Sequence, residues 1–167
     1  RKGLYYISDH FLEFWFKFVY PHRSELELDN RKPVLDRLTR HFIDSHVSFV
    51  YEAICRDLLE QMIVRGQIDF SLSRSGSYWS GSTQIDVMAV DLEGQRVIAG
   101  ECKYHEDPVG VDVYYDLREK CAGIPELENQ SVTYAVFSKS GFTEKMLETA
   151  EGNEKLLLVD ENRLICG

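Results

Sequence analysis

Two short apolar segments that carry charged side chains constrain the fold of this chain more than any other feature. Residues 85–91 read IDVMAVD and residues 97–103 read VIAGECK. Apolar residues occupy both alternating faces of each segment, a pattern typical of a central strand covered on two sides. The segment 91–95 contains a glycine, which favours a tight turn. We therefore predict an antiparallel hairpin inside a sheet.

The alternation also predicts which side chains share a face of the hairpin. On the first strand, one face carries Asp86, Met88 and Val90, and the opposite face carries Ile85, Val87 and Ala89. On the second strand, one face carries Val97, Ala99, Glu101 and Lys103, and the opposite face carries Ile98 and Cys102. Charges at the ends of apolar strands cost free energy unless they are paired or bound to a metal. Two carboxylates and a lysine in this place therefore indicate a site.

The overall charge bears on which partners the chain can take. It has 167 residues, enough for one domain with a real core, and a hydrophobic content of 44%, which is ordinary for a globular protein. The formal net charge of −9 argues against a simple basic nucleic-acid-binding protein. It leaves open an enzyme that meets phosphates through a divalent ion.

Cysteine usage and hydropathy indicate a cytoplasmic protein. The four cysteines are widely spaced and form no Cys-x-x-Cys motif, so we expect free thiols in a reducing compartment. No signal peptide is recognisable, and no apolar run reaches the roughly 20 residues that a membrane span needs. The first residue is Arg1, not Met, which leads us to expect a fragment of a longer protein.

The first 30 residues are predicted to form an aromatic helical lead segment and a linker, followed by one domain over residues 31–167. Residues 4–20 predict a helix that is apolar on almost all sides, with Ser8 or Asp9 as its N-cap and Pro21 after its end. Two interpretations stay open: a core helix, or a helix that docks against an upstream domain. Residues 22–32 are polar and predict a linker.

The remaining pattern predicts an α/β domain. Helices are expected at 33–42, 47–64, 109–121 and 142–150, and strands at 67–72, 85–91, 97–103, 132–137 and 155–159, with an edge strand ending at Cys166. Breaks are expected at 44–46 and in the loop 73–82. The first three strands would form an antiparallel meander, and the fourth would follow a crossover helix and lie parallel to the third. The result is a mixed sheet with helices on both faces.

This order, with Asp86 followed by Glu101-Cys102-Lys103, resembles the PD-(D/E)XK nuclease superfamily, which has the restriction-endonuclease-like fold with an α-β-β-β-α-β core. The superfamily also places a glutamate on the helix before the sheet, where this chain has Glu52. The leading proline of the motif is replaced by Ile85, at a position that varies widely in the superfamily. Residues 6–9 (YISD), 14–18 (FWFKF), 100–103 (GECK) and 137–143 (FSKSGFT) also resemble the uncharacterised C-terminal domain of archaeal-type AAA+ ATPases, over nearly the whole chain.

The resemblance implies a magnesium-dependent or manganese-dependent nuclease acting on DNA, within a chain that also holds an ATP-binding AAA+ domain. Asp86, Glu101 and the backbone carbonyl of Cys102 would hold the metal, and Glu52 would hold a metal-bound water or a second ion. These ligands suit Mg²⁺, which prefers oxygen. Lys103 would orient or deprotonate the attacking water, or stabilise the developing charge.

Other polar residues have plainer alternatives. Arg74 and Lys139 are candidates for contacting a nucleic-acid backbone, and Gln84 is expected to line the site because it shares the face of Asp86. The segment 138–141 is expected to be a capped turn, with a phosphate site at the following helix as its alternative. Residues 104–106 are expected to be loop, and His41 and His46 to be surface residues.

Two functions stay open at this stage. The first is a catalytic nuclease domain. The second is a catalytically silent nuclease-fold module that binds DNA or a partner and regulates the ATPase, which the acidic net charge favours. In the silent reading, Glu101 and Lys103 form an ordinary ion pair and Glu52 is a solvated helix residue. A homo-oligomer is compatible with either function.

Overall fold

The computed structural model describes residues 7, 9–42, 46–93, 95–161 and 163–166, and it divides into two compact units, residues 1–50 and 51–167. Each unit is described by itself. The predicted division into a lead segment 1–30 and a domain 31–167 stays a prediction. Among the described residues, no helix is both long enough and apolar enough to cross a membrane.

The first unit is helical. Its elements are α1 (His10–Phe14), the π-helix η1 (Trp15–Val19), the 3-10 helix η2 (Tyr20–His22), α2 (Arg23–Glu27) and α3 (Arg31–Phe42). Asp9 is the N-cap of α1, because its side chain accepts a hydrogen bond from the backbone N–H of Leu12 at 2.9 Å. Ser8, the other predicted N-cap, lies outside the described residues. The predicted break at 44–46 also falls mostly outside them.

Two expectations for this unit were wrong. The segment 22–32 was predicted as a linker, but it contains α2 and the start of α3. Its charged side chains form ion pairs on the helix surface, as between Arg23 and Glu27 four positions apart in α2, so polarity does not prevent a helix here. His46 was expected at the surface, but it is 8% exposed and its ring packs against Phe14, Phe18 and Phe42. The side chain of His41 lies outside the described part.

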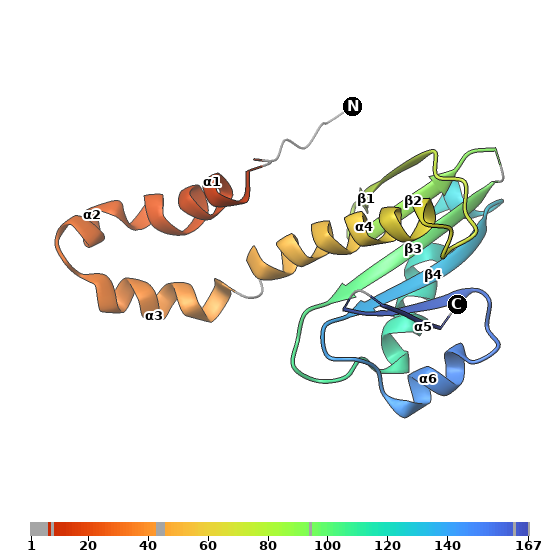
Figure 1. Cartoon of the computed structure of the whole chain (residues 1–167). Coiled ribbons are helices and arrows are strands. Elements are labelled where there is room, and N and C mark those ends of the chain that lie inside the picture. The colour runs from red at the N-terminus through yellow and green to blue at the C-terminus, as the bar shows by residue number, and fades with distance from the viewer. Residues whose placement is uncertain (1–6, 8, 43–45, 94, 162, 167) are drawn as a thin grey trace. The chain divides into compact units, whose positions relative to one another are not determined.

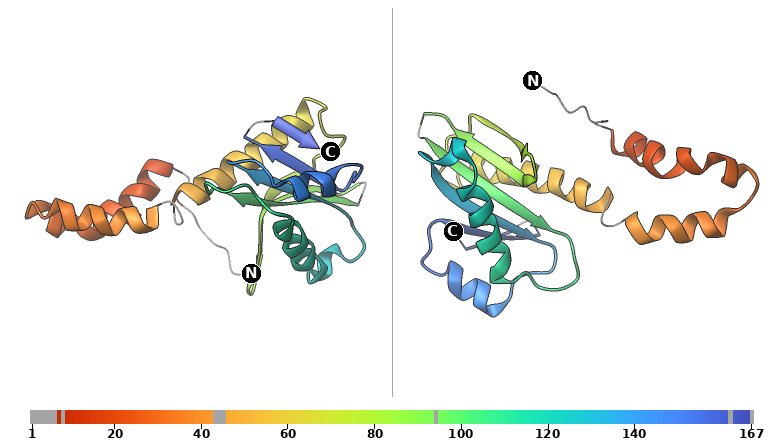
Figure 2. Two further views of the ribbon diagram at one scale, coloured as in Figure 1. Left: turned by 90° about the horizontal axis from the view of Figure 1, so that it is seen from below. Right: turned by 180° about the vertical axis from the view of Figure 1, so that it is seen from behind.

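The second unit is built on one six-stranded sheet with helices on both faces, as Figures 1 and 2 show. Its elements are α4 (Ser48–Val64), β1 (Arg74–Ser80), β2 (Thr83–Asp91), β3 (Arg96–Lys103), α5 (Val111–Ala122), the 3-10 helix η4 (Pro125–Leu127), β4 (Ser131–Ser138), α6 (Glu144–Ala150), β5 (Leu156–Asp160) and β6 (Arg163–Cys166). The strands lie in the order of the chain, from β1 to β6.

The predicted fold class is confirmed. Strands β1, β2 and β3 form an antiparallel meander, and β4 and β5 continue the sheet in parallel after the crossover helices α5 and α6. The last strand, β6, is antiparallel at the edge. The order α4-β1-β2-β3-α5-β4 is the α-β-β-β-α-β core expected of a restriction-endonuclease-like fold, and the aromatic helix precedes it.

Apolar side chains form a core on each side of the sheet. On one side α4 packs Cys55, Leu59, Met62 and Ile63 against buried strand residues such as Phe137. On the other side α5 and α6 cover the sheet through two further clusters that include Leu117 and Met146. The central strands are therefore covered on both faces, as their sequence pattern predicted.

The first strand of the meander was predicted in the wrong place. Residues 67–72 form no ladder, although Ile68, Phe70 and Leu72 pack against the α4 core cluster. The strand is instead β1, in the Ser- and Gly-rich segment predicted as a loop. Ser80 pairs with Thr83 across a two-residue turn that begins with Gly81, whose φ is +59°. A glycine in that turn closes a hairpin, which outweighs the weak strand propensity of the serines.

A β-bulge in β2 changes one predicted face. Tyr78 pairs with Ile85 and Gly76 with Met88, so two residues of β2, Asp86 and Val87, lie opposite a single residue of β1. Ile85 consequently packs in the cluster under α5, whereas Val87 packs in the cluster under α4. The prediction that Ile85 and Val87 share a face was wrong, because simple alternation assumes a ladder without an extra residue.

Candidate functional site

The predicted acidic residues come from three neighbouring elements of the second unit. Because β2 runs antiparallel to β3, the beginning of β2 lies beside the end of β3, and this brings Asp86 to Glu101 and Lys103. Glu52 lies in the first turns of α4, which packs across this part of the sheet (Figure 1). Asp86 and Glu101 both act electrostatically on Glu52.

Asp86 is fixed by the backbone of the neighbouring strand. Its Oδ2 accepts a hydrogen bond from the backbone N–H of Cys102 at 2.9 Å, and its Oδ1 lies 3.5 Å from the amide nitrogen of Gln84. The carboxylate sits at the bulge of β2, a place where β-bulges commonly re-aim a side chain. Gln84 thus lies next to Asp86, and its role in lining a site stays a prediction.

Glu101 is the most enclosed charged residue of the group. It is only 7% exposed, and each of its carboxylate oxygens faces a lysine. Lys103 Nζ lies 2.9 Å from Oε1, and Lys120 Nζ, which comes from α5, lies 2.8 Å from Oε2. Glu101 and Lys103 therefore do not form the solvated surface ion pair that was one alternative, because Glu101 is buried.

Sequence reasoning did not identify Lys120. It lies three positions after the buried Leu117, and residues at this spacing share a face of a helix, so Lys120 is near the side of α5 that packs on the sheet. The signal is weak, because many surface helices carry a lysine near their C-terminus.

Burial and like charges shift the titration of the carboxylates. Burial, followed by the charges of Asp86 and Glu101, raises the pKa of Glu52 to about 7. Burial and the charge of Glu101 raise the pKa of Asp86, although the N–H of Cys102 acts in the opposite direction. For Lys103, burial works against the charged form, but the hydrogen bond and charge of Glu101 outweigh it and raise its pKa. Glu52 is therefore no ordinary solvated helix residue.

Cys102 separates the two faces of the site. Its side chain packs toward α4, where burial and its hydrogen bond with Cys55 raise the pKa of its thiol. The glutamate before it and the lysine after it lie on the opposite side, toward α5. The thiols of Cys55, Cys102 and Cys121 are free, as expected of the described cysteines.

A second polar group lies just beyond the end of β3. Lys103 pairs with Ser138 in the sheet, and the next backbone N–H, that of Lys139, donates to the carbonyl of Lys103 at 3.2 Å. Lys139 Nζ lies 2.7 Å from Oε1 of Glu106 and 4.8 Å from the centre of the Tyr104 ring. The structure thus brings Lys139 to the edge of the site.

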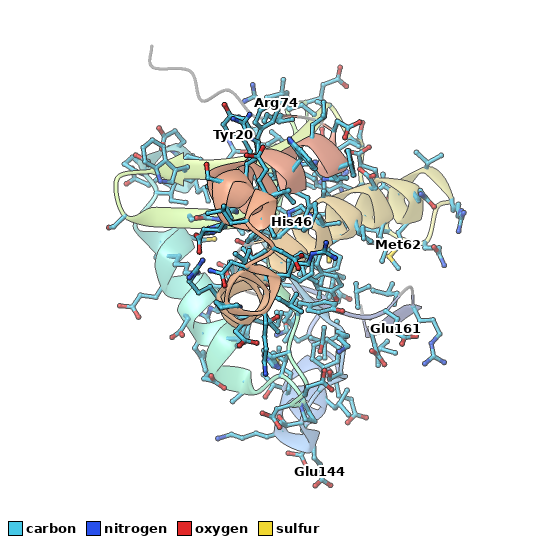
Figure 3. The ribbon with its side chains drawn as sticks, turned by 90° about the vertical axis from the view of Figure 1, so that its left-hand side faces the viewer. Tyr20, His46, Met62, Arg74, Glu144 and Glu161 are labelled. Atoms are coloured by element: carbon cyan, nitrogen blue, oxygen red, sulfur yellow. The ribbon has the colours of Figure 1, made fainter. Side chains whose placement is uncertain are left out.

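Arg74 is not brought to the site. It is exposed on the edge strand β1 and pairs with Val90, four residues along β2 from Asp86. In Figure 3 it lies at the opposite end of the second unit from Glu144 of α6. A contact between Arg74 and nucleic acid stays a prediction, separate from the carboxylate cluster.

The segment 138–141 forms the capped turn that was predicted. The hydroxyl of Ser138 donates to the carbonyl of Gly141 at 2.8 Å and accepts from the N–H of Ser140 at 3.1 Å. Thr143, not one of these serines, is the N-cap of α6. Residues 104–106 are loop, as expected.

The carboxylate oxygens of this group are ligands that suit a hard divalent cation, but the described side chains do not form a complete coordination sphere. Three carboxylates, those of Glu52, Asp86 and Glu101, lie in one electrostatic group. Burial is the main cause of the raised pKa values of the first two, and the negative charges of their neighbours add to it. A cation would relieve the repulsion among these charges. Within the part of the chain that the structure describes, no three His, Cys, Asp or Glu side chains are grouped closely enough to hold an ion.

Comparisons with known proteins place the chain among archaeal and bacterial sequences. Residues 15–120 match the model of the family DUF234, described as archaea bacterial proteins of unknown function. The uncharacterized protein MJECL04 of Methanocaldococcus jannaschii is 24% identical over 162 residues, which cover 94% of this chain and 34% of that protein. The chain thus spans about a third of the length of this relative.

One solved structure is also similar in part. The crystal structure of a repair endonuclease from Pyrococcus abyssi shares 14% sequence identity and a TM-score of 0.40, over 62% of this chain and 44% of that one.

Proposed function

This chain belongs to the family DUF234, and we propose that its second unit, residues 51–167, is a magnesium-dependent phosphodiesterase that cleaves DNA. We further propose that it forms the C-terminal part of a longer cytoplasmic protein with an AAA+ ATPase domain. The single observation that carries the proposal is that Asp86, Glu101 and Lys103 lie together at the neighbouring ends of two otherwise apolar strands, with Glu52 of α4 in the same electrostatic group.

We assign the binding of the ion to Asp86, Glu101 and the backbone carbonyl of Cys102, and the holding of a bound water to Glu52. When bound, a divalent ion supplies charge neutralisation at the phosphate and makes a water molecule more acidic. Manganese would serve in the same place, since it accepts the same oxygen ligands.

The protein groups contribute orientation and hydrogen bonding. The N–H of Cys102 holds the Asp86 carboxylate at the end of β3. Lys103 is protonated in this arrangement, because Glu101 favours its charged form, so it is suited to donate a hydrogen bond to the attacking water or to a phosphate oxygen. Of the roles expected for Lys103, charge stabilisation and orientation thus fit better than deprotonation of water.

DNA would approach along the edge where β3 and β4 end. Gln84 and Lys139 lie at this edge, and Tyr104 lies under the Lys139 ammonium. A lysine that can leave Glu106 to pair with a phosphate, and a partly exposed tyrosine beside it, are groups that commonly hold a nucleic-acid backbone.

A cleavage assay tests the proposal. The full chain is incubated with supercoiled plasmid and with single-stranded DNA in Mg²⁺, in Mn²⁺ and in EDTA. We expect cleavage that requires the ion and that falls at least about 100-fold in Lys103→Ala, the size typical of losing a positioned catalytic group. Lys145→Ala, which removes an exposed lysine from α6, serves as the matched control. Cleavage in EDTA, or cleavage unchanged in Lys103→Ala, contradicts the proposal.

A second function is favoured by one observation. Both oxygens of Glu101 are engaged by lysines, which is an arrangement that can hold a nuclease fold together without any ion. We propose as the alternative a silent module that binds DNA or the ATPase and regulates it. Isothermal titration separates the two: a chain that takes up no Mg²⁺ or Mn²⁺ but binds the ATPase domain tightly is a scaffold.

A further inference from the structure

The salt bridge between Lys120 and Glu101 connects a helix to the candidate metal site. Lys120 Nζ lies 2.8 Å from Oε2 of Glu101, and the Glu101 side chain is 10% exposed. Lys103 takes the other oxygen at 2.9 Å. The two lysines differ in origin, because Lys103 follows Glu101 on the same strand while Lys120 reaches it from α5, nineteen positions along the chain.

Formal charges show what Lys120 does to the group. Glu52, Asp86 and Glu101 bring three formal negative charges, although Glu52, with a pKa of about 7, is only partly ionised near neutral pH. Lys103 and Lys120 bring two positive charges, and Arg56, whose charge acts on Glu52, brings a third. Lys120 also acts on Asp86, since its charge is among those that favour the ionised form of that carboxylate. The site is therefore nearly neutralised from within, and a cation entering it competes with an ammonium that is already bound.

We propose that Lys120 is a positioning residue that sets the affinity of this carboxylate cluster for divalent cations, by occupying Glu101 when no ion is bound. An incoming ion must share or displace the Lys120 ammonium. The consequence is a site that loads only at a higher ion concentration than its three carboxylates alone would require. This inference rests on the proposed function, because it concerns the same site.

Replacing Lys120 by Gln removes one positive charge a few ångströms from the ion, so the cluster should bind Mn²⁺ on the order of tenfold more tightly. Lys120→Arg keeps the charge and should stay within about twofold of the wild-type affinity, since a guanidinium can also pair with a carboxylate. The Lys120 side chain is 37% exposed, so Gln fits without burying a new polar group.

Mn²⁺ binding to the full chain is measured by electron paramagnetic resonance of the free ion and by isothermal titration, with no DNA present. The variants are Lys120→Gln, Lys120→Met and Lys120→Arg, and Lys145→Gln on the exposed face of α6 is the control for the loss of one lysine charge. Circular dichroism confirms that each variant is folded. The two neutral variants are expected to bind more tightly, and the other two to match the wild type.

Equal affinities in Lys120→Gln, Lys120→Met and the wild type overturn the inference while leaving the proposed function intact. A weaker affinity in the neutral variants also overturns it, because Lys120 would then support the ligand and not compete with the ion. No Mn²⁺ binding in any variant overturns both the inference and the metal-dependent function. Tight, Lys120-sensitive binding without DNA cleavage keeps the inference and contradicts only the nuclease proposal.

Discussion

The backbone N–H of Cys102 donates a hydrogen bond to Oδ2 of Asp86 at 2.9 Å. This bond joins the end of β3 to the bulge of β2, where the regular ladder between the two strands has stopped at the pair Val87 and Gly100. The side chain of Asp86 thus accepts a hydrogen bond from β3 just beyond the point where the backbone ladder between β2 and β3 ends. Its carboxylate has a structural partner as well as a candidate catalytic role, and the two can be separated.

Asp86→Asn and Asp86→Ala should differ in stability but not in function. Asn keeps an oxygen that can accept from Cys102, whereas Ala leaves that N–H without its partner, at a cost of about 1 kcal/mol in the free energy of unfolding. Both remove a negative charge from the cluster, so both should lose Mn²⁺ binding and DNA cleavage. Urea denaturation and Mn²⁺ titration check this, and cleavage retained by Asp86→Asn contradicts it.

Glu52 should make the stability depend on pH. Its pKa is raised from the ordinary value of 4.5 to about 7 in the folded chain, so the folded state binds more protons than the unfolded state between these values. Stability should therefore fall as the pH rises from about 4.5 to about 7, because the ionised form is the disfavoured one.

Glu52→Gln should remove that dependence. The variant should be more stable than the wild type at pH 8 by about 1 kcal/mol, after an allowance for the solvent that screens a half-exposed group, and nearly equal to it at pH 4.5. Urea denaturation in EDTA at both pH values measures the difference, with the exposed Glu148→Gln on α6 as the control. An equal effect of Glu52→Gln at both pH values argues against the raised pKa.

Lys139 should contribute to DNA affinity without contributing to the chemical step. Lys139→Ala is expected to weaken DNA binding about three- to tenfold and to lower the slope of log affinity against log salt by about one, as for one phosphate contact. Glu106→Ala, which frees the Lys139 ammonium from its 2.7 Å ion pair, should act in the opposite direction. Fluorescence anisotropy with labelled DNA in Ca²⁺ measures both. Unchanged slopes argue against a phosphate contact.

Gly100 should tolerate no side chain. A Cβ at this position would lie 3.0 Å from Cε2 of Phe137 and 3.1 Å from Cβ of Val87, both of which are buried in the α4 core cluster. Gly100→Ala is therefore expected to lower the free energy of unfolding by about 1–3 kcal/mol. Gly76→Ala, in β1, meets no atom within 4 Å and should change it by less than about 0.5 kcal/mol. Guanidinium denaturation of both variants checks the contrast.

Residues 47–167 should fold by themselves. The three core clusters of the sheet unit contain only residues from Tyr51 onward. A fragment that begins before α4 should unfold in one cooperative transition and bind Mn²⁺ with the affinity of the full chain. Denaturation followed by circular dichroism, with the full chain beside it, is the measurement. A fragment without a cooperative transition shows that the first 46 residues are needed for this core.

The strongest sequence signals predicted the centre of the fold correctly. Residues 85–91 and 97–103 carry so many apolar side chains on both faces that only a covered hairpin can bury them, and the structure has β2 and β3 there. Glu101 and Lys103 follow from the same alternation, and the structure pairs them at 2.9 Å. These positions are predictable because the apolar pattern of the segment matches the burial of the same residues in the folded sheet.

The errors occur where a distant partner decides the local structure. Gly81 closes a hairpin, so the serine-rich segment 74–80 becomes a strand only because β2 is present to pair with it. The extra residue at the bulge moves Ile85 to the other face, which alternation within one strand cannot reveal. Lys120 reaches Glu101 only after α5 has packed on the sheet, and its spacing from the buried Leu117 is only a weak sequence signal for this contact.

The arrangement of the sheet has a consequence for how the chain acquires its structure. Each inner strand of the sheet, β2 to β5, is flanked by its immediate predecessor and successor in the chain, and each edge strand pairs with the strand next to it in the chain. No strand pairs with a segment that is distant in the chain, so pairing can advance from β1 toward β6 as the polypeptide leaves the ribosome. The parallel pairings of β4 and β5 should form most slowly, because each requires a crossover helix. The carboxylates of β2 and β3 would then meet early, before α5 delivers the ammonium that restrains their repulsion.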